Sequence, residues 1–167
     1  FLLWGQDLSD AGPGARPYTD YVSAPNADRR GEYLHIAAHL LVGHLTDVHG
    51  QWTETAGNYR ESFLAQEDTE VLRRVLLGMG SLSGAELSGE RMGVAYSTRE
   101  QEDEHSCFSD NTHRDMLLNA KGVQNVWHGT YTRIDGTKVE GTGLKAVVSA
   151  KDSELAGKLT AAIDASV

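Results

Sequence analysis

The sequence predicts an all-α protein built as a bundle of long helices. Three stretches of the chain repeat apolar residues at intervals of three and four, which is the spacing of one helix face. No stretch sustains the alternation of apolar and polar residues that marks a half-buried strand. Short links separate the helical stretches, as they do in helical bundles.

Composition limits the possible partners of the chain. Its 167 residues include 40% hydrophobic and 23% charged residues, which is ordinary for a globular protein. Acidic residues outnumber basic ones by 24 to 15, and no window has the excess of Lys and Arg that a nucleic acid requires. No apolar run approaches the roughly 18 residues of a transmembrane segment. Cys107 is the single cysteine, which excludes a disulfide within the chain and a cysteine-based zinc site.

The first part of the chain is expected to be a linker followed by a long helix. Residues 5–25 contain all three prolines and lack helical periodicity, which indicates an extended connection. Asn26 is a suitable cap for a helix over residues 26–52. We therefore predict the end of a preceding helix plus a linker over residues 1–25 and a helical bundle domain over 26–167, cut at both ends. The apolar face of the long helix consists of Leu34, Ala38, Leu41, Leu45, Val48 and Trp52.

Four further elements are predicted along the chain, from the apolar spacing and from turn and cap residues. A second helix is predicted from Asp68 to about Ser97, and a third from the cap-rich cluster at residues 109–112. Asp135-Gly136 indicates a turn or small hairpin over 134–143. Asp152 is expected to cap a last helix that runs to about Ala165. The second helix has the apolar face Leu72, Val75, Leu76, Met79 and Leu82, and the third has Met116, Ala120, Val123, Trp127 and Tyr131.

Two carboxylates interrupt the apolar face of the second helix. At about 100° per residue, Glu86 and Glu90 fall on the line of Met79. A buried carboxylate needs a cation or a dense set of donors, so we expect both to be largely buried and paired with Arg91, His105 or a bound cation. The alternative is that this end of the helix emerges into solvent.

The second helix is also rich in glycine. Each glycine costs up to about 1 kcal/mol against alanine in a helix interior. The concentration indicates close approach by another backbone, or a kink. The glycines are Gly78, Gly80, Gly84, Gly89 and Gly93.

The segment 102–113 concentrates four carboxylates, two imidazoles, a thiol and several hydroxyl groups. Hard oxygen donors together with imidazole suit iron, zinc, manganese or calcium. A solvated charge run is the alternative, but Cys107-Phe108 within it indicates a segment that dips into the core. We therefore expect His105, Asp110 and Asn111 to line a site, and Cys107 to be a reduced, poorly accessible thiol.

A di-iron carboxylate bundle is a further hypothesis. Glu32 precedes His35 by three residues, Glu102 precedes His105 by three, and His35 and His39 share a helix face. Two such Glu-x-x-His pairs are half of a di-iron ligand set. The position of Glu102 in an expected loop argues against it. The remaining carboxylates would come from Glu61, Glu86 or Glu90.

Three segments together resemble the imelysin-like family: Phe1–Leu8 (FLLWGQDL), Gly78–Met92 (GMGSLSGAELSGERM) and Gln101–Thr112 (QEDEHSCFSDNT). Proteins of this family belong to the bacterial cell envelope and are linked to iron uptake, and some were described as insulin-cleaving metallopeptidases. The resemblance implies an all-helical, bilobed protein whose halves face each other across a cleft. This chain would be the linker and most of the second lobe.

The resemblance implies a cell-envelope protein of the periplasm or outer-membrane surface, associated with iron uptake, that binds a metal or metal-linked ligand in the interlobe cleft. The cofactor would be a divalent metal, iron or zinc, and the partners would be iron-uptake or other envelope components. The alternative is a metallopeptidase in which a metal held by His and Glu activates water. No signal peptide is visible in the chain.

The family's polar motifs also suggest which residues face the cleft, whereas no catalytic residue is assigned. His105 is the candidate metal ligand. The family signature Gly-x-His-x-x-Glu does not occur in this chain; we expect it in the missing N-terminal lobe. The chain alone should therefore neither hydrolyse peptides nor hold a transition metal tightly. The cleft residues would be Glu86, Glu90, Arg91, Glu104, Ser109, Asp110 and Asn111.

Overall fold

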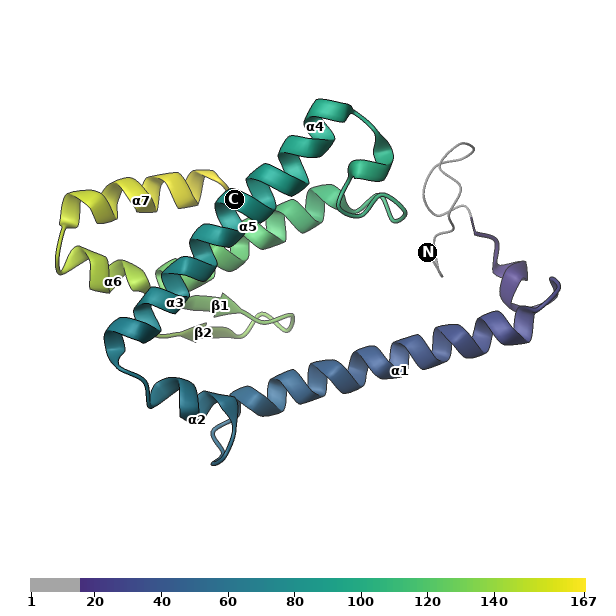
Figure 1. Cartoon of the computed structure of the whole chain (residues 1–167), viewed down its shortest axis with the longest axis horizontal. Helices are drawn as coiled ribbons and strands as arrows, with labels where there is room; N and C mark the ends of the chain where they lie inside the picture. Colours follow the sequence, from purple (N-terminus) through teal and green to yellow (C-terminus); the bar gives the residue numbers. More distant parts are fainter. Residues whose placement is uncertain (1–15) are drawn as a thin grey trace. The chain divides into compact units, whose positions relative to one another are not determined.

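The computed structural model describes residues 16–167 (Figure 1). The predictions for the start of the chain, including the family-like segment Phe1–Leu8, lie outside the described residues. The chain divides into two compact units between Gly78 and Met79. Both are helical apart from two short strands, which confirms the all-α prediction. Within residues 16–167, none of the helices combines the length and the apolar content needed to cross a bilayer.

The first unit is dominated by one long helix. It contains the 3₁₀ turn η1 (Tyr18–Tyr21), α1 (Ala27–Trp52), α2 (Tyr59–Leu64) and the start of α3 (Asp68–Gly80). Helix α1 confirms the helix predicted over 26–52, but Asn26 does not cap it with its side chain, and its φ of 63° is left-handed. Arg30 secures this end instead, because its guanidinium donates to the carbonyls of Asp20 and Pro25, both at 2.7 Å.

The end of α1 turns into α2 through an aromatic cluster. The Trp52 ring meets those of Tyr59 and Phe63 edge to face, with centroids 5.3 and 5.6 Å apart. Asn58 caps α2 by accepting a hydrogen bond from the Glu61 amide at 3.2 Å. Farther back along α1 the apolar face is largely exposed, and Leu45 is 60% accessible.

The second unit contains a long π-helical stretch, the short helix α4 and three α-helices that pack on one another. Helix α5 contacts η2, α6 and α7, and α6 contacts α7 (Figure 1). The helices predicted over 68–97 and from residue 112 are therefore confirmed, although the first is not α-helical throughout. The elements are η2 (Ser81–Gly93), α4 (Val94–Thr98), η3 (Gln101–Asp103), α5 (Thr112–His128), β1 (Thr130–Thr132), β2 (Lys138–Glu140), α6 (Leu144–Ser149) and α7 (Ser153–Ala165).

The stretch η2 is a π-helix, in which hydrogen bonds join residues five apart and each turn is wider than in an α-helix. Its glycines serve this geometry. A β-carbon built on Gly93 would lie 3.0 Å from the carbonyl oxygen of Ser88, and one on Gly89 would lie 3.3 Å from that of Gly84. The predicted approach by another backbone is therefore wrong for these glycines: the atoms met at Gly89 and Gly93 belong to the same helix, five residues earlier, and a β-carbon at Gly78, Gly80 or Gly84 would meet nothing within 4 Å.

The core of the second unit is centred on Trp127, which is 2% exposed. Its indole nitrogen donates to the hydroxyl of Thr160 on α7 at 3.0 Å. Helix α5 ends one residue later, at His128, because Gly129 adopts a φ of 72° and its amide closes the last turn on Asn125 at 2.8 Å. Tyr131, expected on the face of this helix, therefore belongs to β1 instead.

The predicted hairpin and last helix are both present. Strands β1 and β2 pair antiparallel with Tyr131 opposite Val139. The Asp135 carboxylate accepts from the Thr137 amide at 2.8 Å in the turn. Asp152 caps α7 as predicted, by accepting from the Leu155 amide at 2.9 Å.

Candidate functional site

The two glutamates of η2 are exposed, so the prediction that they are buried is wrong. The prediction placed them with a period of 3.6 residues, whereas in a π-helix residues five apart share a face. Glu86 and Arg91 are such a pair: the guanidinium lies 3.7 Å from the carboxylate, with side chains 48% and 44% exposed. The expected pairing of Glu86 with Arg91 is therefore confirmed, as a surface ion pair. Such pairs contribute little to stability.

A second carboxylate, which the sequence did not single out, organises the segment 104–112. Asp115 lies in the first turn of α5. Its Oδ2 accepts from the Ser106 hydroxyl and lies 3.0 Å from Nδ1 of His105. Its Oδ1 accepts from the side-chain amide of Asn111 at 3.3 Å. We call His105, Ser106, Asn111 and Asp115 the Asp115 cluster.

The surroundings of Asp115 favour its ionised form. The Ser106 hydroxyl, and after it His105 and Asn111, hold the pKa of the Asp115 carboxyl below its ordinary value of 3.8, while desolvation opposes them. An ionised carboxylate only accepts hydrogen bonds, so Nδ1 of His105 carries the hydrogen. The imidazole is thereby fixed with Nε2 as the nitrogen left for another partner.

A second set of contacts attaches Glu104 to the cluster. The Thr112 hydroxyl donates to Oε2 of Glu104 at 3.1 Å and accepts from the Ser106 amide at 3.2 Å. The Ser109 hydroxyl donates to the Ser106 carbonyl at 3.3 Å. Asp110 has a φ of 50°, a left-handed conformation at the last turn before α5. The structure thus brings Glu104, His105 and Asn111 together, and Ser109 and Asp110 shape the loop that carries them.

Cys107 and Phe108 lie in the same loop and are half-buried. The thiol is free, and the Cys107 carbonyl accepts from the side-chain amide of Gln101 at 3.3 Å. Glu102, half of one Glu-x-x-His pair of the di-iron hypothesis, is exposed in the short 3₁₀ helix η3.

Histidines that ligate a metal commonly bond one ring nitrogen to a carboxylate and the other to the metal. His105 has the first of these contacts, with Asp115, and its other ring nitrogen is available. A complete zinc or iron site needs more. Within residues 16–167, no three His, Cys, Asp or Glu side chains converge on one point. The Asp115 cluster therefore offers one imidazole but not the three or four ligands of a full site.

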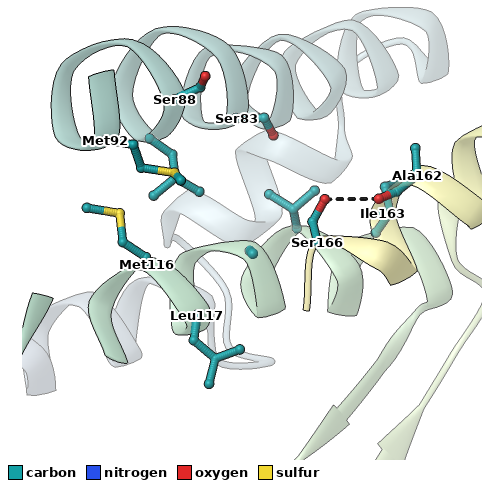
Figure 2. A pocket seen from close by; sticks show the side chains of 11 residues that line it. Ser83, Ser88, Met92, Met116, Leu117, Ala162, Ile163 and Ser166 are labelled. Carbon is teal, nitrogen blue, oxygen red and sulfur yellow. Dashed lines mark hydrogen bonds between the residues drawn. The ribbon is translucent and has the colours of Figure 1, made fainter. Parts of the chain in front are cut away.

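An apolar pocket adjoins the cluster along α5, where Met116 follows Asp115. It has a volume of about 590 Å³, which is within the roughly 300–1,000 Å³ of small-molecule pockets. Figure 2 shows Met92 of η2 and Met116 of α5 pointing toward each other across it. The hydroxyl of Ser166 turns back to the Ala162 carbonyl at 2.9 Å (Figure 2). The lining residues are Ser83, Leu87, Ser88, Met92, Met116, Leu117, Ala120, Val123, Ala162, Ile163 and Ser166.

The η2 wall of this pocket shows the π-helical period directly. Ser83 and Ser88 are five residues apart, and so are Leu87 and Met92. This five-residue register turns Leu87 and Met92 inward and leaves Glu86 outside the pocket lining. Similar residues five apart are visible in the sequence and indicate this face of η2, but a search for apolar residues at the 3.6-residue period of an α-helix does not find them.

A second imidazole–carboxylate pair ties α5 to α7. Nε2 of His128 lies 2.8 Å from Oδ1 of Asp164, and the side-chain amide of Gln124 donates to the same oxygen at 2.9 Å. His128 first, then Gln124, lower the pKa of Asp164. The contact joins two helices at the side of the Trp127 core, so its role is structural.

Fold and site together define an all-helical protein with a carboxylate-centred polar cluster next to an apolar pocket. The family model described as Imelysin matches residues 1–167, and the chain belongs to the imelysin family. This match confirms the resemblance inferred from the three sequence segments. A comparison with curated proteins finds no match.

Proposed function

We propose that the chain is part of an imelysin-like protein of the bacterial cell envelope that takes part in iron uptake by binding a metal or a metal-linked ligand. The Asp115 cluster is the observation that supports this proposal. Asp115 holds Nδ1 of His105 and so leaves Nε2 for another partner, and the Thr112 hydroxyl attaches the Glu104 carboxylate to the same loop. Imidazole and carboxylate oxygen are ligand types that suit iron and zinc. The residues of this chain would supply part of the binding surface.

The geometry favours binding over peptide hydrolysis. A catalytic metal typically requires about three protein ligands and an open position for water. Within the part of the chain that the structure describes, no such group converges. His105 and Ser106 both contact Asp115 rather than each other, so they do not form a nucleophile and its base either. The metallopeptidase alternative thus has no support from these residues.

A location in the periplasm or on the outer membrane, and partners among iron-uptake components, form part of the same proposal. Both rest on membership of the imelysin family. Cell fractionation of the native host, followed by detection of the protein in the envelope fractions, tests the location directly. Recovery in the cytoplasmic fraction alone would contradict it.

The binding proposal is tested by calorimetric titration with Zn²⁺ and with Fe²⁺, beside a peptide-cleavage assay. We expect weak binding that falls by roughly tenfold or more in His105→Ala, as removal of a ligand or its support does. The matched control is His113→Ala, since His113 is an exposed imidazole at the start of α5, the helix that carries Asp115. Equal binding by His105→Ala and the unaltered protein, or peptide cleavage by this chain, would contradict the proposal.

A further inference from the structure

Helix α1 carries two histidines in contact on its surface. His35 and His39 are one turn apart, and their ring centroids are separated by 4.3 Å with the planes at 66°. Both residues are exposed. They belong to the first unit, whereas the Asp115 cluster belongs to the second.

A surface hollow of α1 lies beside the two rings. Gly31 and Gly43 continue the same four-residue row at either end, and a β-carbon at either glycine would meet nothing within 4 Å. His35, His39, Gly43 and Asp47 line one surface hollow. Water molecules could therefore complete the coordination of an ion held between the two imidazoles.

We propose that His35 and His39 form a two-imidazole site for a divalent transition metal. A metal at about 2.0–2.1 Å from one nitrogen of each ring needs those nitrogens only about 3 Å apart. Rings that already touch across one helical turn reach this separation by small side-chain rotations. When two histidines are four residues apart on a helix, they lie on one face and can both bind the same zinc ion.

Charge on this helix supports a cation. Glu32 lies one turn before His35 on the same side of α1, and Asp47 lines the hollow. Each carboxylate lowers the energy of a nearby positive ion. Imidazole ligands favour Cu²⁺, Ni²⁺ and Zn²⁺, with Cu²⁺ bound most tightly in the general order of divalent metals.

Two ligands are fewer than the three or four of catalytic and structural zinc sites, so the affinity is modest. This agrees with the expectation that the chain alone does not hold a transition metal tightly. The site does not depend on the proposed function of the Asp115 cluster.

The test is a titration of the full chain with Cu²⁺ and with Ni²⁺, followed by calorimetry and by the NMR signals of the imidazole rings. His35→Ala and His39→Ala should each weaken binding roughly tenfold or more, because each removes one arm of a chelate. His49→Ala is the matched control. His49 is exposed on the same helix and does not line the hollow, and the residues four positions away from it are Leu45 and Thr53.

Hydrogen exchange supplies a second readout, independent of affinity. A metal that bridges one helical turn stabilises it, so the amides around residues 35–43 should exchange more slowly with Ni²⁺ present. The effect should vanish in His35→Ala and persist in His49→Ala and His105→Ala. Binding that is unchanged in both His35→Ala and His39→Ala would overturn the proposal, as would an equal loss in His49→Ala. A loss confined to His105→Ala would place the ion at the Asp115 cluster.

Discussion

Replacement of single glycines by alanine in η2 distinguishes a π-helix from an α-helix. Gly84 and Gly93 both lie in this stretch, yet a β-carbon meets nothing within 4 Å at Gly84 and lies 3.0 Å from the Ser88 carbonyl oxygen at Gly93. The two substitutions have identical chemistry and an identical effect on the helix propensity of the residue. A difference in the free energy of unfolding between the two variants therefore reports the close backbone contact that the wide π-helical turn creates at Gly93.

The expected difference is about 2 kcal/mol. In an open helical position, alanine is favoured over glycine by roughly 0.5–1 kcal/mol, and Gly84→Ala should gain this amount. At Gly93 the same gain is opposed by a contact several tenths of an ångström too short, and overpacking of this kind costs about 1–3 kcal/mol. Gly93→Ala should therefore be destabilised by about 1 kcal/mol.

Urea unfolding of the two variants and the unaltered protein measures these differences as shifts in midpoint at constant slope. Far-UV circular dichroism checks that all three remain helical. If Gly93→Ala is stabilised as much as Gly84→Ala, residues 88–93 do not have the π-helical spacing. The exposure of Glu86 would then need another cause.

Four further predictions concern Asp115, Glu86 and Cys107. Asp115→Ala should lower the free energy of unfolding by about 2 kcal/mol, since three hydrogen bonds to a half-buried carboxylate are lost. The pKa of Asp115 is lowered on folding, so the ionised carboxylate stabilises the fold above pH 3.8, and this stabilisation is lost as the pH falls below that value. In Asp115→Asn the free energy of unfolding should therefore fall less steeply with decreasing pH in the acid range. Glu86→Ala should change urea stability by less than about 0.5 kcal/mol, because its ion pair is exposed. Cys107 should react slowly with a thiol reagent in the native protein, and labelling as fast as in urea would contradict its partial burial.

The helices that the sequence predicted correctly are those in which apolar spacing or a capping residue indicates the same element as the structure. Helix α1 has a long apolar row at 3.6-residue spacing, and Asp152 has both the residue type and the position of a cap for α7. Gly129 shows the opposite case. The apolar spacing of α5 continues to Tyr131, but the helix ends at His128, three residues after Asn125, because Gly129 adopts a positive φ.

Part of the site could not be derived from spacing. The prediction that Glu86 is buried was wrong because it assumed the period of an α-helix, whereas the backbone of η2 makes hydrogen bonds between residues five apart. Asp115 was missed because its partners come from a loop, four to ten residues earlier, whose path depends on the left-handed conformation of Asp110. Residue types in that loop were nevertheless informative. They placed His105 and Asn111 in a common site, where the structure joins them through one carboxylate.

The central claim is that Asp115 positions His105 for a metal or metal-linked ligand. The most direct measurement is a Zn²⁺ titration followed by the His105 ring signals in NMR spectra of the unaltered protein and of Asp115→Asn. We expect saturable shifts of the His105 signals in the unaltered protein, and at least about tenfold weaker binding once the carboxylate is replaced. His105 signals that do not respond to Zn²⁺, or that respond equally in both proteins, would contradict the claim.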